Sequence, residues 1–266
     1  MDAKVSSLHR EQGSVPHIVG VEVVLKTQEP RLVKEAKKFK KSQANNASEP
    51  EFILYFGLEG VDIRSTKKPN KRGYQIDFST IDRRTGSGNL SRKQVFPKAI
   101  GANSKTVIDT TAGLGADAAM LALMGYSVTA IEKSPILSIL LRDGLYRAQQ
   151  NQELSEALGN RLTFSEANSL GVLNSASAPD VVYLDPMFPP KRKKSALPSG
   201  NIQMLQKIVG YDNQEQTQSL FNSAMKAATK RVVVKRPNYA TTFSNNPAAI
   251  HKGKLVRYEV YKPACD

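Results

Sequence analysis

The sequence predicts an α/β protein in which a small α/β unit precedes a doubly wound, mostly parallel sheet. Two observations support this prediction. Downstream of residue 105, strand-like apolar runs alternate with helical stretches, a pattern typical of parallel strands joined by helical crossovers. Upstream of residue 95, a short basic helical stretch and two strand-like runs indicate a separate small unit. With 266 residues, of which 40% are hydrophobic, the chain can bury the core of one large domain and a small one.

The N-terminal part predicts a small basic α/β domain that spans residues 1–95. Residues 31–41 have the spacing of a short basic helix. Strands are predicted at 52–57 and 74–78, separated by a loop rich in Lys, Arg, Pro, Asn and Gly. The second domain is then expected to span residues 96–266.

The second domain contains the alternating pattern. Strands are predicted at 106–109, 128–132, 162–165, 181–185 and 232–235, with helices at 116–124, 135–151 and 216–226. A last alternating run, 255–261, is expected to add an edge strand. In open sheets of this kind, ligands bind beyond the carboxyl ends of the strands.

Composition and charge narrow the class of function. The formal net charge of +14 favours a polyanionic partner. The single cysteine, Cys265, is compatible with a reducing compartment, and no signal peptide or membrane-spanning run is apparent, so we expect a cytoplasmic protein without a membrane partner. His9, His17 and His251 lack the spacing of metal ligands, so no metal site is expected.

A glycine turn follows the first strand of the predicted large sheet, in the sequence VIDTTAGLG at 107–115. Gly113 and Gly115 would let the backbone approach a ligand closely, and Asp109 can accept a hydrogen bond from an ammonium group or organise the loop. Glu132 ends the next strand, where an acid commonly accepts both ribose hydroxyls of a nucleoside. This order of elements predicts a nucleoside cofactor, although the loop lacks the third glycine of the dinucleotide fingerprint.

A second motif follows the strand at 181–185, in the sequence DPMFPP. An exocyclic amine of a base is a poor nucleophile because its lone pair is delocalised into the ring. We expect the Asp185 carboxylate and the Pro186 carbonyl each to accept one N–H and so direct the lone pair toward a sulfonium methyl, while Phe188 stacks on the base. Methyl transfer then depends mainly on positioning and requires no metal.

These motifs closely resemble the RsmJ family of bacterial methyltransferases, which modify the exocyclic N2 of a guanine in 16S ribosomal RNA. No resemblance is apparent before residue 70. The matching stretches are 109–118, 131–135, 140–145, 181–197 and 230–237, together with the basic segment 76–88. The resemblance implies a Rossmann-like class I methyltransferase fold, S-adenosyl-L-methionine as the cofactor, and 16S ribosomal RNA or the small ribosomal subunit as the partner.

The resemblance also implies the positions of the cofactor contacts. The family often has an arginine where this chain has Ala116, so a contact there must come from the backbone. The implied contacts are Ala116, Asp117, Glu132, Lys133, Asn168, Ser169 and Asp185.

Basic residues near the two motifs are candidates for RNA binding. One such cluster alone is typical of a solvated face, but several around one predicted site favour contacts with phosphates. The candidates are Arg83, Arg84, Arg92, Lys93, Lys191, Arg192, Lys193, Lys194, Lys235 and Arg236.

Three other functions remain open at the level of the sequence. The acid–proline–aromatic motif also serves enzymes that methylate adenine N6 or a protein glutamine. An inactive RNA-binding module could have kept the fold, although the intact Glu132 and Asp185 argue against it. An NAD-dependent oxidoreductase would need an acid or base near the glycine turn, and none is obvious.

Overall fold

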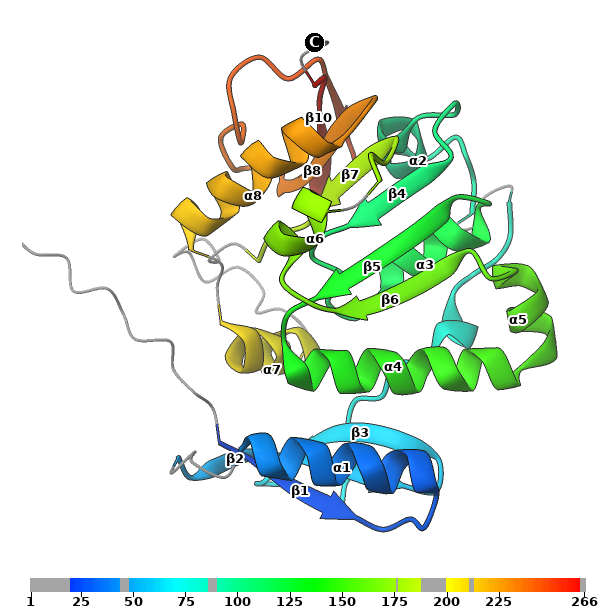
Figure 1. Cartoon of the computed structure of the whole chain (residues 1–266), viewed down its shortest axis with the longest axis vertical. Helices are drawn as coiled ribbons and strands as arrows, with labels where there is room; N and C mark the ends of the chain where they lie inside the picture. The colour runs from blue at the N-terminus through cyan, green and yellow to red at the C-terminus, as the bar shows by residue number, and fades with distance from the viewer. Residues whose placement is uncertain are drawn as a thin grey trace, which may run out of the picture.

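The computed structural model describes residues 20–43, 48–85, 90–175, 177–187, 200–210 and 213–263. These residues form two sheets, a three-stranded one with the order β1-β2-β3 and a seven-stranded one with the order β6-β5-β4-β7-β8-β10-β9. Figure 1 shows the small sheet and its helix below the large sheet, with α4 and α7 between them.

The small unit begins with a parallel β-α-β crossover. Its elements are β1 (Gly20–Leu25), α1 (Pro30–Ser42), β2 (Pro50–Gly57) and β3 (Gly60–Ser65). Strand β1 pairs with β2 in parallel, and β3 returns antiparallel to β2. Helix α1 buries Leu32, Ala36 and Phe39, which are four and three residues apart and therefore share one face. The predicted basic helix and the strand at 52–57 are confirmed, whereas β1 and β3 had not been predicted.

The predicted strand at 74–78 is wrong. Tyr74 forms a single antiparallel bridge with Ile63, and the chain then turns into a 3-10 helix, η1 (Phe78–Thr80). The Asp77 side chain accepts a hydrogen bond from the Ser79 amide at 2.9 Å and so caps this turn. The local hydrogen bond competes with a continued strand.

The large sheet confirms all five predicted parallel strands. They are β4 (Thr106–Asp109), β5 (Ser127–Glu132), β6 (Leu162–Glu166), β7 (Val181–Leu184) and β8 (Arg231–Pro237). Strand β10 (Val256–Tyr261) is antiparallel to β8, but it is not the edge strand, because β9 (Ala249–Lys252) pairs on its outer side. The chain reverses its direction of travel across the sheet between β4 and β7, so the crevice at their carboxyl ends is the topological switch point.

Helices pack on both faces of the large sheet. The three predicted helices are confirmed as α3, α4 and α8. The helices are α2 (Val95–Ile100), α3 (Ala116–Leu123), α4 (Pro135–Gln150), α5 (Gln152–Leu158), α6 (Ser169–Ser175), α7 (Gly200–Val209) and α8 (Gln214–Ala227). In the part of the chain that the structure describes, none of these helices is long and apolar enough to span a membrane.

The apolar core is continuous between the small unit and the large sheet. One cluster of buried side chains includes Leu54, Val61 and Ile76 together with Val107 and Leu141. The predicted division at residues 95 and 96 therefore does not coincide with a break in the core.

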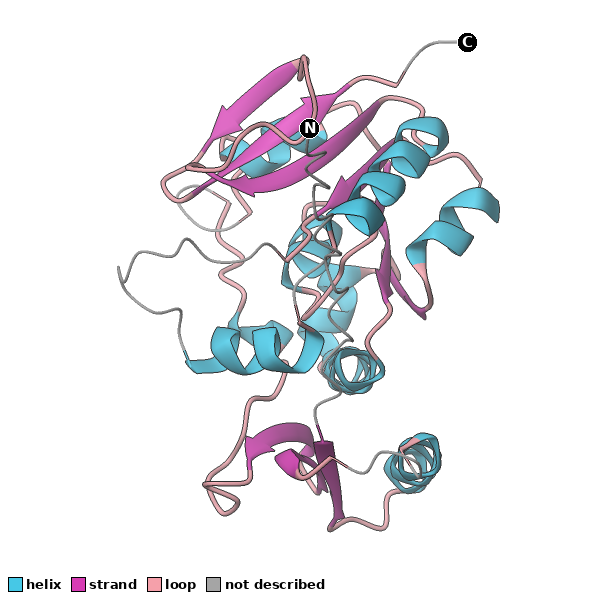
Figure 2. Cartoon of the chain, turned by 90° about the vertical axis from the view of Figure 1, so that its left-hand side faces the viewer, coloured by secondary structure: helices cyan, strands magenta, loops and turns pink. Residues whose placement is uncertain are grey.

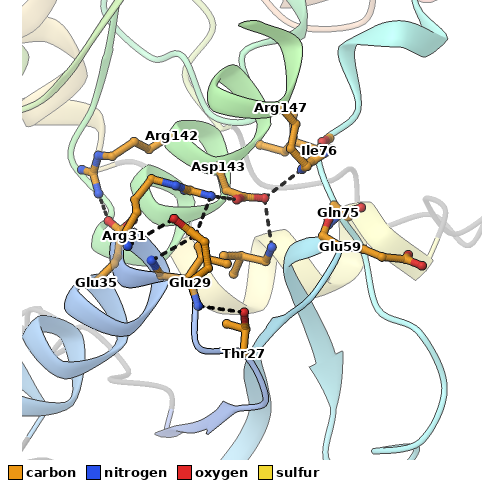
Figure 3. Close-up of polar contacts among 12 residues, drawn as sticks. Thr27, Glu29, Arg31, Glu35, Glu59, Gln75, Ile76, Arg142, Asp143 and Arg147 are labelled. Atoms are coloured by element: carbon orange, nitrogen blue, oxygen red, sulfur yellow. Dashed lines mark hydrogen bonds and ion pairs between the residues drawn. The ribbon is translucent and has the colours of Figure 1, made fainter. Parts of the chain in front are cut away.

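A buried carboxylate on α4 joins the small unit to the rest of the protein. Asp143 is 0% exposed and accepts hydrogen bonds at 2.9 Å from Arg31 Nη2, Arg147 Nε and the Val61 amide (Figure 3). A Cβ atom added to Gly60 would lie 2.5 Å from Asp143 Oδ2, so only glycine leaves room for this contact. Asp143 of α4 thus links Arg31 of α1 and the start of β3 to α4 and holds the small unit in a fixed position.

Candidate active site

A cavity of about 360 Å³ lies at the carboxyl ends of β4, β5 and β7, at the switch point of the sheet. This is where sequence analysis placed the site. The lining includes seven predicted residues, Gly113, Glu132, Lys133, Asn168, Ser169, Asp185 and Pro186. It also includes residues that had not been predicted, namely Thr110, Thr111, Leu137, Leu170, Met187, Val209, Gln216, Thr217 and Leu220.

Glu132 connects the cavity to the glycine turn. Its side chain is 6% exposed, and its two oxygens accept hydrogen bonds from the Gly113 amide at 2.8 Å and the Ser134 amide at 2.7 Å. Burial raises the pKa of Glu132, and the two backbone donors offset part of this effect. Each carboxylate oxygen has two acceptor sites, so the group can hold the turn and still accept hydroxyl donors from a ligand.

The two glycines of the turn have different roles. Gly113 lines the cavity at φ +55°, and nothing but the Thr111 carbonyl lies within 4 Å of an added Cβ. Gly115 does not line the cavity. It adopts φ +73° at the start of α3, and an added Cβ would lie 2.5 Å from Leu141 Cδ1, so packing accounts for this glycine.

Asp109 is buried beneath the turn and does not line the cavity. Its carboxyl group accepts a hydrogen bond from the Thr111 amide at 3.1 Å. Burial raises its pKa well above the ordinary value, because nothing nearby compensates fully for lost hydration. Of the two roles predicted for Asp109, the structure favours organisation of the loop over contact with a ligand.

A lysine on β8 joins two of the predicted acids. Lys235 Nζ lies 2.9 Å from Asp117 Oδ2 and 2.9 Å from Asp185 Oδ2, and the Tyr183 hydroxyl donates to the same oxygen of Asp117 at 2.6 Å. Burial lowers the pKa of Lys235, but the carboxylates of Asp185 and Asp117 more than offset it, so the pKa lies above its ordinary value. The placement of Lys235 among RNA-binding residues is therefore corrected, because its ammonium group lies between two carboxylates.

Of four other predicted cofactor contacts, two lie away from the cavity, and two line it but also form hydrogen bonds within the protein. Ala116 and Asp117, in the first turn of α3, do not line the cavity. Ser169 lines it, but its hydroxyl donates to the Thr110 carbonyl at 2.6 Å. Asn168 also lines it, and its side-chain oxygen accepts from the Leu170 amide at 3.1 Å, which holds the start of α6.

The structure describes the DPMFPP motif only as far as Met187. The Asp185 amide donates to Thr111 Oγ1 at 2.6 Å, which ties the end of β7 to the loop after β4. Pro186 is buried, and both Pro186 and Met187 line the cavity. Phe188 and the basic run Lys191, Arg192, Lys193 and Lys194 lie outside the described residues.

Most of the other predicted RNA-binding residues have acceptors within the protein. Arg83 pairs with Glu153 at 2.5 Å and Arg84 with Asp82 at 2.7 Å. Arg92 donates to the Met124 carbonyl at 2.8 Å, Lys93 is exposed, and Arg236 donates to the Thr241 carbonyl at 3.0 Å. Their contacts with phosphate stay predictions.

Comparison with known proteins identifies the family. A family model described as "Putative SAM-dependent methyltransferase" matches residues 36–263. A protein named ribosomal RNA small subunit methyltransferase J from Aeromonas salmonicida is 38% identical, over 83% of this chain and 90% of its own length. The protein of the same name from Serratia proteamaculans is 37% identical over the same shares. The chain belongs to the ribosomal RNA small subunit methyltransferase J family. Because the match begins at residue 36, the expectation of no resemblance before residue 70 was wrong.

The fold agrees with this family. The crystal structure of a SAM-dependent methyltransferase from Neisseria gonorrhoeae is 29% identical, covers 91% of this chain and 96% of its own, and superposes with a TM-score of 0.64. The predicted Rossmann-like class I methyltransferase fold is thereby confirmed, and S-adenosylmethionine is the cofactor of the family.

The cavity residues fit this cofactor. The Glu132 carboxylate can accept ribose hydroxyls, Leu137 and Leu170 offer apolar surface for an adenine ring, and Gly113 leaves the backbone open. The volume is within the range of small-molecule sites. In the ranges that the structure describes, no group of three or more His, Cys, Asp or Glu side chains could hold a metal ion.

The ion pairs of Lys235 were not predicted, although the sequence contained a signal for them. Residue 235 lies near the carboxyl end of a parallel strand, as do Asp109 and Asp185. Side chains at that edge of a parallel sheet lie close together, so an ion pair could have been predicted. The contribution of Gln216, Thr217 and Leu220 had no such signal, because it depends on how α8 packs.

Proposed function

We propose that the protein transfers the methyl group of S-adenosylmethionine to the exocyclic N2 amine of a guanine in 16S ribosomal RNA. The names of its relatives support ribosomal RNA of the small subunit as the substrate. The observation that carries the proposal is Asp185, which lines the cofactor cavity at the carboxyl end of β7 and is oriented by Lys235 and Thr111. Such a substrate also places the protein in the cytoplasm.

Asp185 acts as the acceptor of the amine hydrogen. Lys235 donates to its Oδ2 and Thr111 accepts from its amide, so both the carboxylate and the backbone of this residue are fixed. The Pro186 carbonyl accepts the second amine hydrogen, and Pro186 has no N–H that would compete. With both hydrogens held, the nitrogen lone pair points along the line of attack, which is the geometry that an in-line displacement needs.

Bound S-adenosylmethionine supplies a methyl group on a positively charged sulfur. Held in this cavity, the cofactor would supply its methyl group to the amine nitrogen, and the sulfur would leave as a neutral thioether. The nitrogen then loses one proton, which the Asp185 carboxylate accepts and passes to solvent. The Lys235 ammonium lies 2.9 Å from Asp185 Oδ2 and so stabilises negative charge on this carboxylate.

The other predicted site residues bind the cofactor or the target base. Glu132 binds the ribose of the cofactor, and Gly113 and Lys133 contact the cofactor beside it. Asn168 and Ser169 lie next to the adenine. All five residues line the cavity. Phe188 stacks on the target guanine. The division into a smaller domain of residues 1–95 and a methyltransferase domain of residues 96–266 stays a prediction.

The test is methylation of 16S ribosomal RNA, both free and in small subunits, with nucleoside mass spectrometry of the product. The wild type should yield N2-methylguanosine. D185A should lose about 10²–10⁴-fold in kcat, as for loss of a group that positions and accepts a proton, and should keep its affinity for the cofactor. D180A is a matched control, because Asp180 precedes the opposite end of β7. N6-methyladenosine or a methylated protein glutamine as the product would refute the guanine assignment.

A further inference from the structure

A basic groove lies on the small unit, separate from the cofactor cavity. The segment 64–72, which reads RSTKKPNKR, has five basic residues and no acidic one. Both its ends are held, because Ile63 and Tyr74 exchange backbone hydrogen bonds at 3.0 and 2.9 Å. The groove has a volume of about 770 Å³, and its lining includes Arg64, Lys68, Lys71 and Arg72 of this segment and Met204 of α7. A smaller hollow beside it is lined by Lys67, Lys207 and again Met204.

Only some of these cations are neutralised within the protein. Arg64 pairs with the buried Asp62 at 2.6 Å and lies over the Tyr55 ring at 3.5 Å, so it has a structural role. Arg72 pairs with Glu59 at 2.8 Å. By contrast, the ammonium groups of Lys67, Lys68 and Lys71 are in exposed residues, and no ion pair joins them to any acid in the described ranges. The groove therefore presents a net positive surface.

Helix α7 connects this groove to the active site. Met204 lines the groove, and Val209 lines the cofactor cavity. At a rise of about 1.5 Å per residue, these two positions are roughly 7–8 Å apart along the helix. If a base of a nucleic acid enters the cavity, the adjacent sugar-phosphate backbone is therefore close enough to lie over the groove.

A second basic surface on the same unit lacks this connection. Helix α1 has exposed lysines at positions 34, 37, 38, 40 and 41. In Figure 2, α1 is seen end-on to the right of the small sheet, whereas α7 lies above the sheet to its left. The exposed lysines of α1 therefore carry the same kind of charge as those of the groove, but they lie on the side of the small unit away from α7.

We propose that the groove of residues 64–72 and α7 binds the phosphate backbone of the RNA next to the target guanine. This inference rests on the proposed function. The charge is complementary to RNA, and the lysines without internal partners can release counterions from phosphates. The Asp143 joint keeps the groove at a constant distance from the cavity, since it fixes the small unit to α4. The small unit would then act as a fixed platform that sets how far the RNA reaches into the active site.

The test compares K67A/K68A/K71A with K34A/K38A/K41A, which removes the same charge from exposed positions of α1. The probe is protein-free 16S ribosomal RNA, with its affinity measured across a series of salt concentrations. Three lost phosphate contacts should flatten the slope of log affinity against log salt by about 2–3 and weaken binding roughly 10–100-fold near physiological salt. The KM for RNA should rise, while kcat and the affinity for S-adenosylmethionine stay constant. The α1 variant should behave like the wild type.

Each other outcome has a distinct meaning. If the wild type neither binds nor methylates RNA, the proposed function itself fails. If the wild type methylates RNA and the two variants are alike, only the groove is refuted. If the groove variant binds free RNA normally but fails on assembled small subunits, the groove binds a ribosomal protein, and the proposal of an RNA-binding groove is again overturned.

Discussion

Removal of the ammonium group of Lys235 should destabilise the protein through its two acidic partners. In K235M the aliphatic stem is kept, but Asp117 and Asp185 face each other without a cation. Their Oδ2 atoms can be no further apart than twice 2.9 Å, because each lies 2.9 Å from the same nitrogen. At an effective dielectric constant of about 20, two such charges repel by roughly 3 kcal/mol.

Exposure to solvent reduces this figure. The side chains of Asp117 and Asp185 are 22% and 38% exposed, so water screens part of the repulsion. We expect the free energy of unfolding at pH 7 to fall by about 1–2 kcal/mol. Because the carboxylates more than offset the lowering effect of burial on the pKa of Lys235, its stabilising charge is present throughout the neutral range. The contribution of the Lys235 charge is lost as the pH rises through its raised pKa.

Urea unfolding of four proteins tests this reasoning: wild type, K235M, D117N and D117N/K235M. In the wild-type background, D117N removes an attraction to Lys235 and should destabilise. In the K235M background it removes a repulsion and should stabilise by about 1 kcal/mol. The Tyr183 hydroxyl can still donate to the asparagine oxygen, so its contact is a constant in the cycle. An effect of D117N with the same sign in both backgrounds would refute the reasoning.

Two further predictions concern the cofactor turn and the joint between the units. In E132Q an amide NH₂ must face the N–H of either Gly113 or Ser134, so the affinity for S-adenosylmethionine should fall about 10–100-fold by calorimetry, as for loss of a hydrogen bond to a charged group. Because burial raises the pKa of Glu132, wild-type affinity should also weaken as the pH falls toward that raised pKa, whereas E132Q should not respond; equal pH profiles would contradict the assignment of the ribose to Glu132. D143A should lower the free energy of unfolding by about 3–5 kcal/mol, since it leaves three donors without their buried acceptor, and the surface variant D82A should change it little. A D143A protein as stable as D82A would show that the joint does not hold the small unit.

The sequence alone predicted the elements whose signals are local. Four of the five parallel strands of the large sheet, β4 to β7, are runs that end in an acid or directly precede one, so both their type and their functional ends are visible in the chain. The strand at 74–78 failed because a side-chain cap at Asp77 ends the extended conformation, and this cap competes with an apolar pattern that is equally local. Strand β1 lies far from its partner β2 in the chain, with α1 between them. Its pairing could only be recognised once the crossover had formed.

The tertiary structure decided which charges meet. Asp185 and Glu132 could be placed at the site from sequence because each ends a strand of the same sheet, and parallel strands bring their carboxyl ends to one edge. Lys235 has the same charge whether it faces water, a phosphate or a carboxylate, so its residue type did not distinguish these environments. Asp117 and Lys235 are separated by 118 positions, and their 2.9 Å contact exists only because β4, which leads into α3, and β8 lie on either side of β7 in the sheet. The same holds for the basic groove: its five cations are evident in the chain, but their position beside α7 results from how the small unit packs against α4.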